Sequence, residues 1–142
     1  MKKLIFRGLL FTYILLLLSF IYVHSDLGGL EGLSYIEKII KCSNLIPFCN
    51  FGPPKSLLIS FIIYMPIALL SRDSFEILNT RKGFYLFIML LIIFIELVQV
   101  LTLHGYFDIN DIIFGFIGTV FVYELFDILI SRIKNRTILN IQ

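Results

Sequence analysis

The stretch Phe84-Tyr-Leu-Phe-Ile-Met-Leu-Leu-Ile-Ile-Phe-Ile-Glu96-Leu-Val-Gln99-Val-Leu-Thr-Leu103 decides the fold of this chain. As a helix at 1.5 Å per residue, it is about 30 Å long, which matches the hydrocarbon core of a bilayer. Glu96 is the one acid inside this run. An ionised acid at bilayer depth costs at least about 2.5 kcal/mol, so its presence indicates a functional site.

Three further apolar stretches predict a bundle around this segment. They run from Leu4 to Val23, from Ser56 to Leu70 and from Ile112 to Ser131. Apolar residues make up 58% of the 142 residues and the mean hydropathy is +0.94, which exceeds the values of soluble domains. We therefore predict an all-α membrane protein, a four-helix transmembrane bundle forming one domain over residues 1–142. Pro66 interrupts the short second stretch, so a full span and a re-entrant segment both remain open.

The distribution of positive charge predicts the orientation of the bundle. With four spans and the N-terminus inside, nine of the twelve Lys and Arg residues lie on the inner face. Retained positive charge marks the cytoplasmic side, so we expect both termini in the cytoplasm. The net charge of +2 then reflects orientation and indicates no nucleic-acid partner. Val23-x-Ser25 resembles a signal-peptide cleavage site, but the preceding apolar run is longer than such peptides carry, and we expect it to be retained.

The longest connection, residues 24–55, is expected on the outer face. Its segment from Ser34 to Lys41 places apolar and charged residues on different sides of a helix, which predicts a short amphipathic helix at the membrane interface. Cys42 and Cys49 are seven residues apart, a spacing that matches no metal motif, and we expect two independent thiols.

Acidic and amide side chains are predicted to meet at the outer ends of the third and fourth spans. Glu96 and Gln99 share a helix face, because they are three residues apart. Asp111 opens the returning span at that same end. The expected outward-opening pocket consists of Glu96, Gln99, Asp108 and Asp111, with Asn44 and His104 at its rim.

Each of these residues also has a purely structural interpretation. Glu96 can be neutral and link two helices by a hydrogen bond, and Asp108 can cap the fourth helix. Asp111 can complement the helix dipole, and His104 can be an ordinary interfacial residue.

Other polar and small residues are assigned structural roles. We expect Gly115 and Gly118 to let the third and fourth spans approach closely, and Pro66 to kink the second span. Glu124 and Asp127 lie on the inner half of the fourth span. We expect them to form ion pairs with Arg7 and Arg72.

Four motifs together resemble the VanZ-like family of small bacterial membrane proteins. In chain order they are Asn44-Leu-Ile-Pro47-Phe48, Tyr64-Met-Pro66-Ile-Ala68, Glu96-Leu-Val-Gln99 and Phe107-Asp108-Ile-Asn-Asp111-Ile-Ile. The resemblance implies a multi-pass protein of the bacterial cytoplasmic membrane and adds Pro47 and Phe48 to the site. The chain departs from the pattern expected of the family where Gly105 replaces an arginine before the paired aspartates, and where Ala68 and Gly115-Phe116 replace glycine and Asn-Thr. It also lacks the asparagine that the family tends to have near Ser60.

The resemblance implies a role in resistance to glycopeptide antibiotics, to teicoplanin more than to vancomycin, without covalent chemistry. Two alternatives remain open: an enzyme acting on a lipid headgroup at the Glu96 and Asp111 pocket, and a small lipid or solute transporter. The paired acids can share a proton, accept hydrogen bonds from a headgroup, or bind a divalent cation. No other cofactor is expected. The expected partners are membrane lipids, a lipid-linked cell-wall precursor, a lipoglycopeptide and further copies of the chain.

Overall fold

The computed structural model describes residues 1–23, 30–49 and 54–139. The elements in chain order are α1 (Lys2–Val23), α2 (Tyr35–Lys41), β1 (Ser43–Asn44), α3 (Pro54–Ile63), α4 (Met65–Arg72), the 3-10 helix η1 (Glu76–Asn79), α5 (Arg81–Leu101), β2 (Phe107–Asp108) and α6 (Ile109–Leu139). The last two residues of the cleavage motif that begins at Val23 lie outside the described residues, so the prediction that this segment is retained stays a prediction.

Within the described residues, four helical stretches are long and apolar enough to cross a membrane. They are Lys2–Phe20, Lys55–Arg72, Arg81–Leu101 and Ile109–Ile133. Each overlaps one of the four apolar stretches of the sequence. The predicted all-α membrane fold is therefore confirmed.

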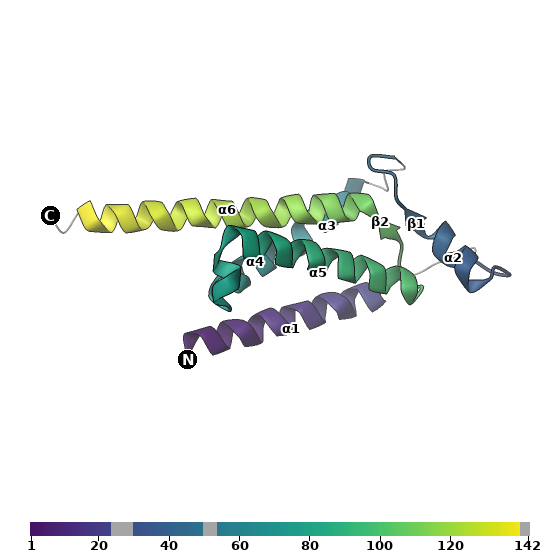
Figure 1. The fold of residues 1–142 in the computed structure, drawn as a ribbon, viewed down its shortest axis with the longest axis horizontal. Helices are drawn as coiled ribbons and strands as arrows, with labels where there is room; N and C mark the ends of the chain where they lie inside the picture. Colours follow the sequence, from purple (N-terminus) through teal and green to yellow (C-terminus); the bar gives the residue numbers. More distant parts are fainter. Residues whose placement is uncertain (24–29, 50–53, 140–142) are drawn as a thin grey trace.

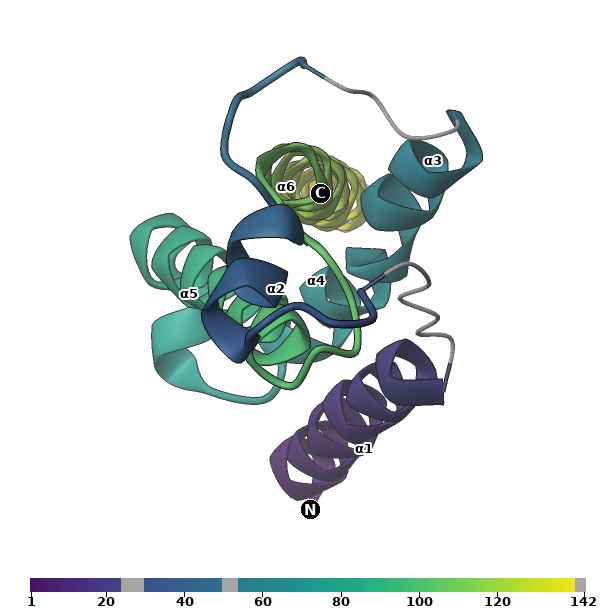
Figure 2. The ribbon, with the colours of Figure 1, turned by 90° about the vertical axis from the view of Figure 1, so that its right-hand side faces the viewer.

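The bundle has two distinct ends (Figure 1). The first residues of α1 and the last turns of α6 lie at one end, which we call the termini end, and α2, β1 and β2 lie at the other, which we call the loop end. Viewed from the loop end, α1 stands apart from α6 (Figure 2). Its neighbours are α4 and α5.

Pro66 divides the second apolar stretch into two helices, α3 and α4. Proline has no backbone N–H and cannot continue the hydrogen-bond ladder of a helix. Ile67 N–H donates to the Tyr64 carbonyl at 3.1 Å, which leaves the Ile63 carbonyl without its helical partner. The hydroxyl of Tyr13 donates to that carbonyl at 2.6 Å. Residues 55–72 together still match the length of a span.

One face of α5 supplies the centre of the core. Phe84, Ile88, Ile92 and Ile95 are buried there at helical spacing, and the Phe84 ring stacks on Tyr123 of α6 at a centroid distance of 4.0 Å. This packing aligns α5 with α6 and carries the end of α5 toward the start of α6 at the loop end.

The two glycines of α6, Gly115 and Gly118, lie against the second span and not, as we had expected, against the third. A Cβ atom at Gly118 would collide with the Phe61 carbonyl of α3, and one at Gly115 would come within 2.7 Å of the Tyr64 ring. Ile92 of α5 is a more distant neighbour of Gly115, at 3.4 Å. The close approach therefore joins the second and fourth spans, whereas we expected the third and fourth.

Ion pairs at the termini end differ in part from the expected ones. Arg72 pairs with Asp127 at 2.5 Å, and Arg81 bridges Glu124 at 3.0 Å and Asp127 at 3.3 Å. Arg7 takes no part, because its Nε donates to a backbone carbonyl in the turn before η1. Arg81 thus holds the place that we expected for Arg7.

Candidate functional site

A two-residue parallel ladder organises the loop end. Ser43 pairs with Phe107 and Asn44 with Asp108. Phe107 N–H also donates to the Cys42 carbonyl at 2.8 Å. Because β1 precedes α3 and β2 precedes α6, this ladder ties the connection between the first two spans to the start of the fourth.

Asp108 lies at the centre of this ladder. Its Oδ1 accepts hydrogen bonds from Asn44 Nδ2 at 3.1 Å and from Asn110 N–H at 2.8 Å. The second bond satisfies one of the free N–H groups at the start of α6, as a capping side chain does. Asp108 therefore combines the capping role with a contact to Asn44.

Glu96 is buried directly beneath β2, with 2% of its surface exposed. Its Oε2 accepts a hydrogen bond from Asp108 N–H at 3.2 Å. Within the described part of the chain, the Glu96 side chain makes this one hydrogen bond. A carboxylate has about four acceptor sites, so Glu96 retains acceptor capacity. It is also close enough to Asp108 and Asp111 to repel both electrostatically.

Asp111 binds a residue that we did not include in the site. Ser60 of α3 donates its hydroxyl to Asp111 Oδ1 at 2.6 Å, and that hydroxyl also lies 3.0 Å from the Ser56 carbonyl. Ser60 is a polar residue in an apolar run, one turn before Tyr64. A polar side chain in such a run is the sequence feature that could have indicated its place in the site. The second span therefore contributes to the acidic site.

Asn110 is the second member that the sequence reasoning missed. It is fully buried, and its Oδ1 accepts the Phe48 N–H at 2.8 Å. Phe48 has a φ of 59°, which is unusual for a bulky residue. Pro47 precedes it and is exposed. Asn110 thus anchors the Pro47–Phe48 segment beside the acids, and its place between Asp108 and Asp111 was the available signal.

Gln99 faces Gly105, which stands where the resemblance to the family led us to expect an arginine. A Cβ atom at Gly105 would come within 2.5 Å of Gln99 Oε1. Leu103 has a φ of 54°, and His104 N–H donates to the Gln99 carbonyl at 2.9 Å, which closes α5 with a Schellman turn. His104 Nδ1 lies 2.7 Å from the Thr102 carbonyl. Because glycine has no Cβ atom, the Gln99 side chain can occupy the space beside Gly105.

The three acids of the site have no basic partner among residues 1–23, 30–49 and 54–139, since no ion pair there involves Glu96, Asp108 or Asp111. In the same ranges, no three His, Cys, Asp or Glu side chains gather closely enough to hold a metal ion. A divalent cation would need further oxygen ligands, such as the phosphate of a lipid. The arrangement suits a cationic or hydrogen-bond-donating group.

Comparison with known proteins identifies the family. The sequence profile of the VanZ/LLP1 family matches residues 10–130, and so covers the second and third spans, most of the first and fourth, and the whole acidic site. The chain belongs to the VanZ/LLP1 family. Protein VanZ of Enterococcus faecium is 27% identical to it over 118 residues, which are 83% of this chain and 71% of that protein. No solved structure matches.

Membership of the VanZ/LLP1 family confirms the resemblance inferred from the four motifs. Together with the four apolar helices, it makes the chain a multi-pass membrane protein. Three of the four motifs meet at the loop end, where they supply Asn44, Glu96, Asp108 and Asp111. The motif of the second span adds Tyr64, which packs on Gly115 below them.

Proposed function

We propose that this VanZ/LLP1 protein contributes to glycopeptide resistance in the bacterial envelope, and that it acts by binding at the loop-end acids without covalent chemistry. The resistance is expected to be stronger against teicoplanin than against vancomycin. Family membership supports the class of function. The observation that carries the binding role is the cluster of Glu96, Asp108 and Asp111, which has no basic partner in the described residues.

The proposed orientation puts the loop end outside the cytoplasmic membrane and both termini in the cytoplasm. The ion pairs of Lys2, Lys3 and Arg81 all lie at the termini end, where the chain collects its positive charge. Positive charge favours the cytoplasmic side. The acids then lie at the outer surface, where a cell-wall precursor and an antibiotic would meet them.

The surroundings of the acids favour a ligand that has both a polar and an apolar part. Five apolar side chains of α2 and the following segment are well exposed, although they lie outside the four spans: Ile36, Ile40, Leu45, Ile46 and Phe48. Such residues are stable at a membrane interface. We propose that the acids bind the polar head of a lipid-linked precursor or a lipoglycopeptide while this surface lies against acyl chains.

The test is the drug sensitivity of a susceptible bacterium that expresses the protein, compared with an empty vector. We expect the wild-type protein to raise the inhibitory concentration of teicoplanin more than that of vancomycin. Asp111→Asn keeps an acceptor for Ser60 but removes the charge, and it should lose the protection at equal membrane abundance. No protection by an abundant wild-type protein would reject the resistance role and favour lipid-headgroup chemistry or transport.

A further inference from the structure

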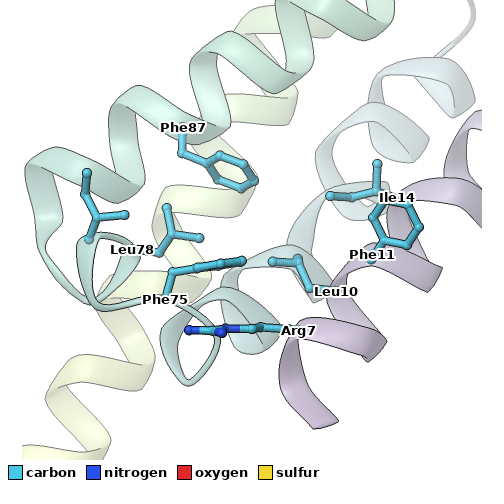
Figure 3. A pocket seen from close by; sticks show the side chains of 8 residues that line it. Arg7, Leu10, Phe11, Ile14, Phe75, Leu78 and Phe87 are labelled. Atoms are coloured by element: carbon cyan, nitrogen blue, oxygen red, sulfur yellow. The ribbon is translucent and has the colours of Figure 1, made fainter. Parts of the chain in front are cut away.

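An apolar groove of about 320 Å³ is lined by residues of α1, η1, α5 and the turn before η1 (Figure 3). None of the loop-end acids is among its lining residues. Phe11 and Ile14 of α1 form one side, and Phe87 of α5 and Phe75 before η1 form the other. Arg7 is the one charged residue in its lining. The groove is therefore a hydrophobic surface groove with a single cationic side chain in its lining.

The position of the groove determines what fills it. Both α1 and α5 are candidate spans, and Phe11 is 65% exposed on the outside of the bundle. The groove therefore opens sideways into the hydrocarbon region, where water is absent and lipid chains are the available apolar matter. An acyl chain buries its methylene groups there against aromatic and branched side chains.

Arg7 is held at the groove by contacts other than a direct ion pair, although the Glu76 carboxylate is near enough to attract it electrostatically. Its Nε donates to the Ser74 carbonyl at 2.9 Å, and its Cζ lies 4.7 Å from the centroid of the Phe75 ring. Within the described residues, no carboxylate forms an ion pair with it. The neighbouring Lys2 and Lys3 differ, since they pair with Asp73 and Glu76. The guanidinium is therefore oriented while its two Nη groups remain available.

Arg7 lies close enough to the end of α1 for its side chain to reach lipid phosphates. It lies five residues beyond Lys2, which is about 7.5 Å along the helix axis. A long arginine side chain at such a depth extends toward the headgroups while its stem covers apolar surface. A planar guanidinium binds a phosphate group by two parallel hydrogen bonds.

We propose that this groove binds one acyl chain of an anionic phospholipid and that Arg7 binds the phosphate of the same molecule. The site is separate from the loop-end acids and does not depend on the proposed role in resistance. It fixes the position of α1, the span with few contacts to the rest of the bundle, against α5 and η1.

The chain contains no tryptophan, so one introduced residue gives an unambiguous fluorescence reporter. Phe11→Trp puts the reporter in the groove, and Phe121→Trp puts it on an exposed position of α6 as the matched control. Each full-length variant is reconstituted in phosphatidylcholine vesicles that contain either brominated phosphatidylglycerol or brominated phosphatidylcholine. Bromine on the chain quenches tryptophan on contact and therefore reports which lipid occupies the site.

At Phe11→Trp, we expect brominated phosphatidylglycerol to associate about fivefold more strongly than brominated phosphatidylcholine, the scale of one accessible ion pair. Arg7→Gln in that background should remove the preference, whereas Lys82→Gln, which removes a charge at the start of α5, should retain it. Phe121→Trp should show no preference. Soluble glycerol phosphate, which has no acyl chain, should not compete.

Three results would overturn the proposal. The first is equal quenching by the two lipids at Phe11→Trp. The second is a preference for brominated phosphatidylglycerol at Phe121→Trp that is as large as at Phe11→Trp, or a loss of that preference in Lys82→Gln as large as in Arg7→Gln. Either would indicate a general attraction of anionic lipid to the basic surface. The third is displacement by soluble glycerol phosphate, which would indicate a phosphate site without a chain. Failure of the resistance assay leaves all of these outcomes unchanged.

Discussion

Asn44 and Asp108 meet twice at the loop end: they are partners in the parallel ladder, and the Asn44 amide donates to the Asp108 carboxylate at 3.1 Å. The two residues are 64 positions apart in the sequence. Their pairing holds the connection after α1 above the start of α6. Because Asp108 N–H also binds Glu96, the same pairing positions the buried acid of α5.

This pairing predicts coupled losses of stability. Asn44→Ala is expected to lower the free energy of unfolding by about 1 kcal/mol, the usual worth of one hydrogen bond. Asp108→Ala should cost more, since it also removes the acceptor of Asn110 N–H. Unfolding in mixed micelles of the two single variants and the double variant measures the coupling, which we expect to exceed about 0.5 kcal/mol. Additive losses would show that the contact contributes nothing.

The break at Pro66 predicts a second coupled pair. Tyr13→Phe removes the hydroxyl that donates to the Ile63 carbonyl, and it should cost about 1 kcal/mol because a partly buried acceptor is left unpaired. Pro66→Ala restores a backbone N–H and lets Ile67 N–H return to the Ile63 carbonyl. In the Pro66→Ala background, Tyr13→Phe should therefore cost clearly less. An equal cost in both backgrounds would contradict this account of the kink.

The packing around Gly118 predicts that a larger side chain there will destabilise the protein, whereas one at Gly8 will not. Gly118→Ala would place a Cβ against the Phe61 carbonyl, so α3 and α6 must separate, and we expect a loss of about 1–3 kcal/mol. At Gly8 an added Cβ meets no atom within 4 Å. Gly8→Ala should leave stability unchanged or raise it by up to about 1 kcal/mol. Equal losses in the two variants would mean that the cost is not a clash.

The two cysteines allow a test of both burial and orientation. Cys49 is exposed and Cys42 is buried, and burial raises the pKa of the Cys42 thiol, while Lys41 opposes this shift. A raised pKa reduces the thiolate fraction at neutral pH, so Cys42 should react slowly with maleimide and should accelerate as the pH rises. Single-cysteine chains made by Cys42→Ala and Cys49→Ala measure the two rates in detergent.

In intact cells, a membrane-impermeant maleimide should label Cys49 of the Cys42→Ala chain. Labelling only after the membrane is permeabilised would place the loop end in the cytoplasm and contradict the proposed orientation.

Much of the fold could be predicted because membrane spans are local features. Length and hydropathy identified all four spans without knowledge of their neighbours. Asp108 and Glu96 could be placed near each other for a similar reason, since a short turn joins the end of α5 to the start of α6. The capping role of Asp108 also depends only on nearby residues.

Contacts between distant segments could not be predicted in the same way. A glycine on α6 indicates a close approach but does not identify the partner, which is Phe61 on α3. Depth made Arg7 and Arg72 the expected partners of Glu124 and Asp127, but depth does not show which helices are neighbours. Because α1 stands apart from α6, Arg81 takes the place that we expected for Arg7. Ser60 was missed because the order of helices around the bundle decides that α3 faces Asp111.

Teicoplanin protection by Glu96→Gln, compared with Glu37→Gln, tests the role of the buried acid most directly. A glutamine side chain at position 96 would keep an acceptor for Asp108 N–H, and one at position 37 preserves the capping box with Ser34, so both variants replace a carboxyl group at the loop end by an amide with little structural change. At matched membrane abundance, we predict that Glu37→Gln protects like the wild type and that Glu96→Gln does not protect. Full protection by Glu96→Gln would contradict the proposal that the buried acid forms the working site.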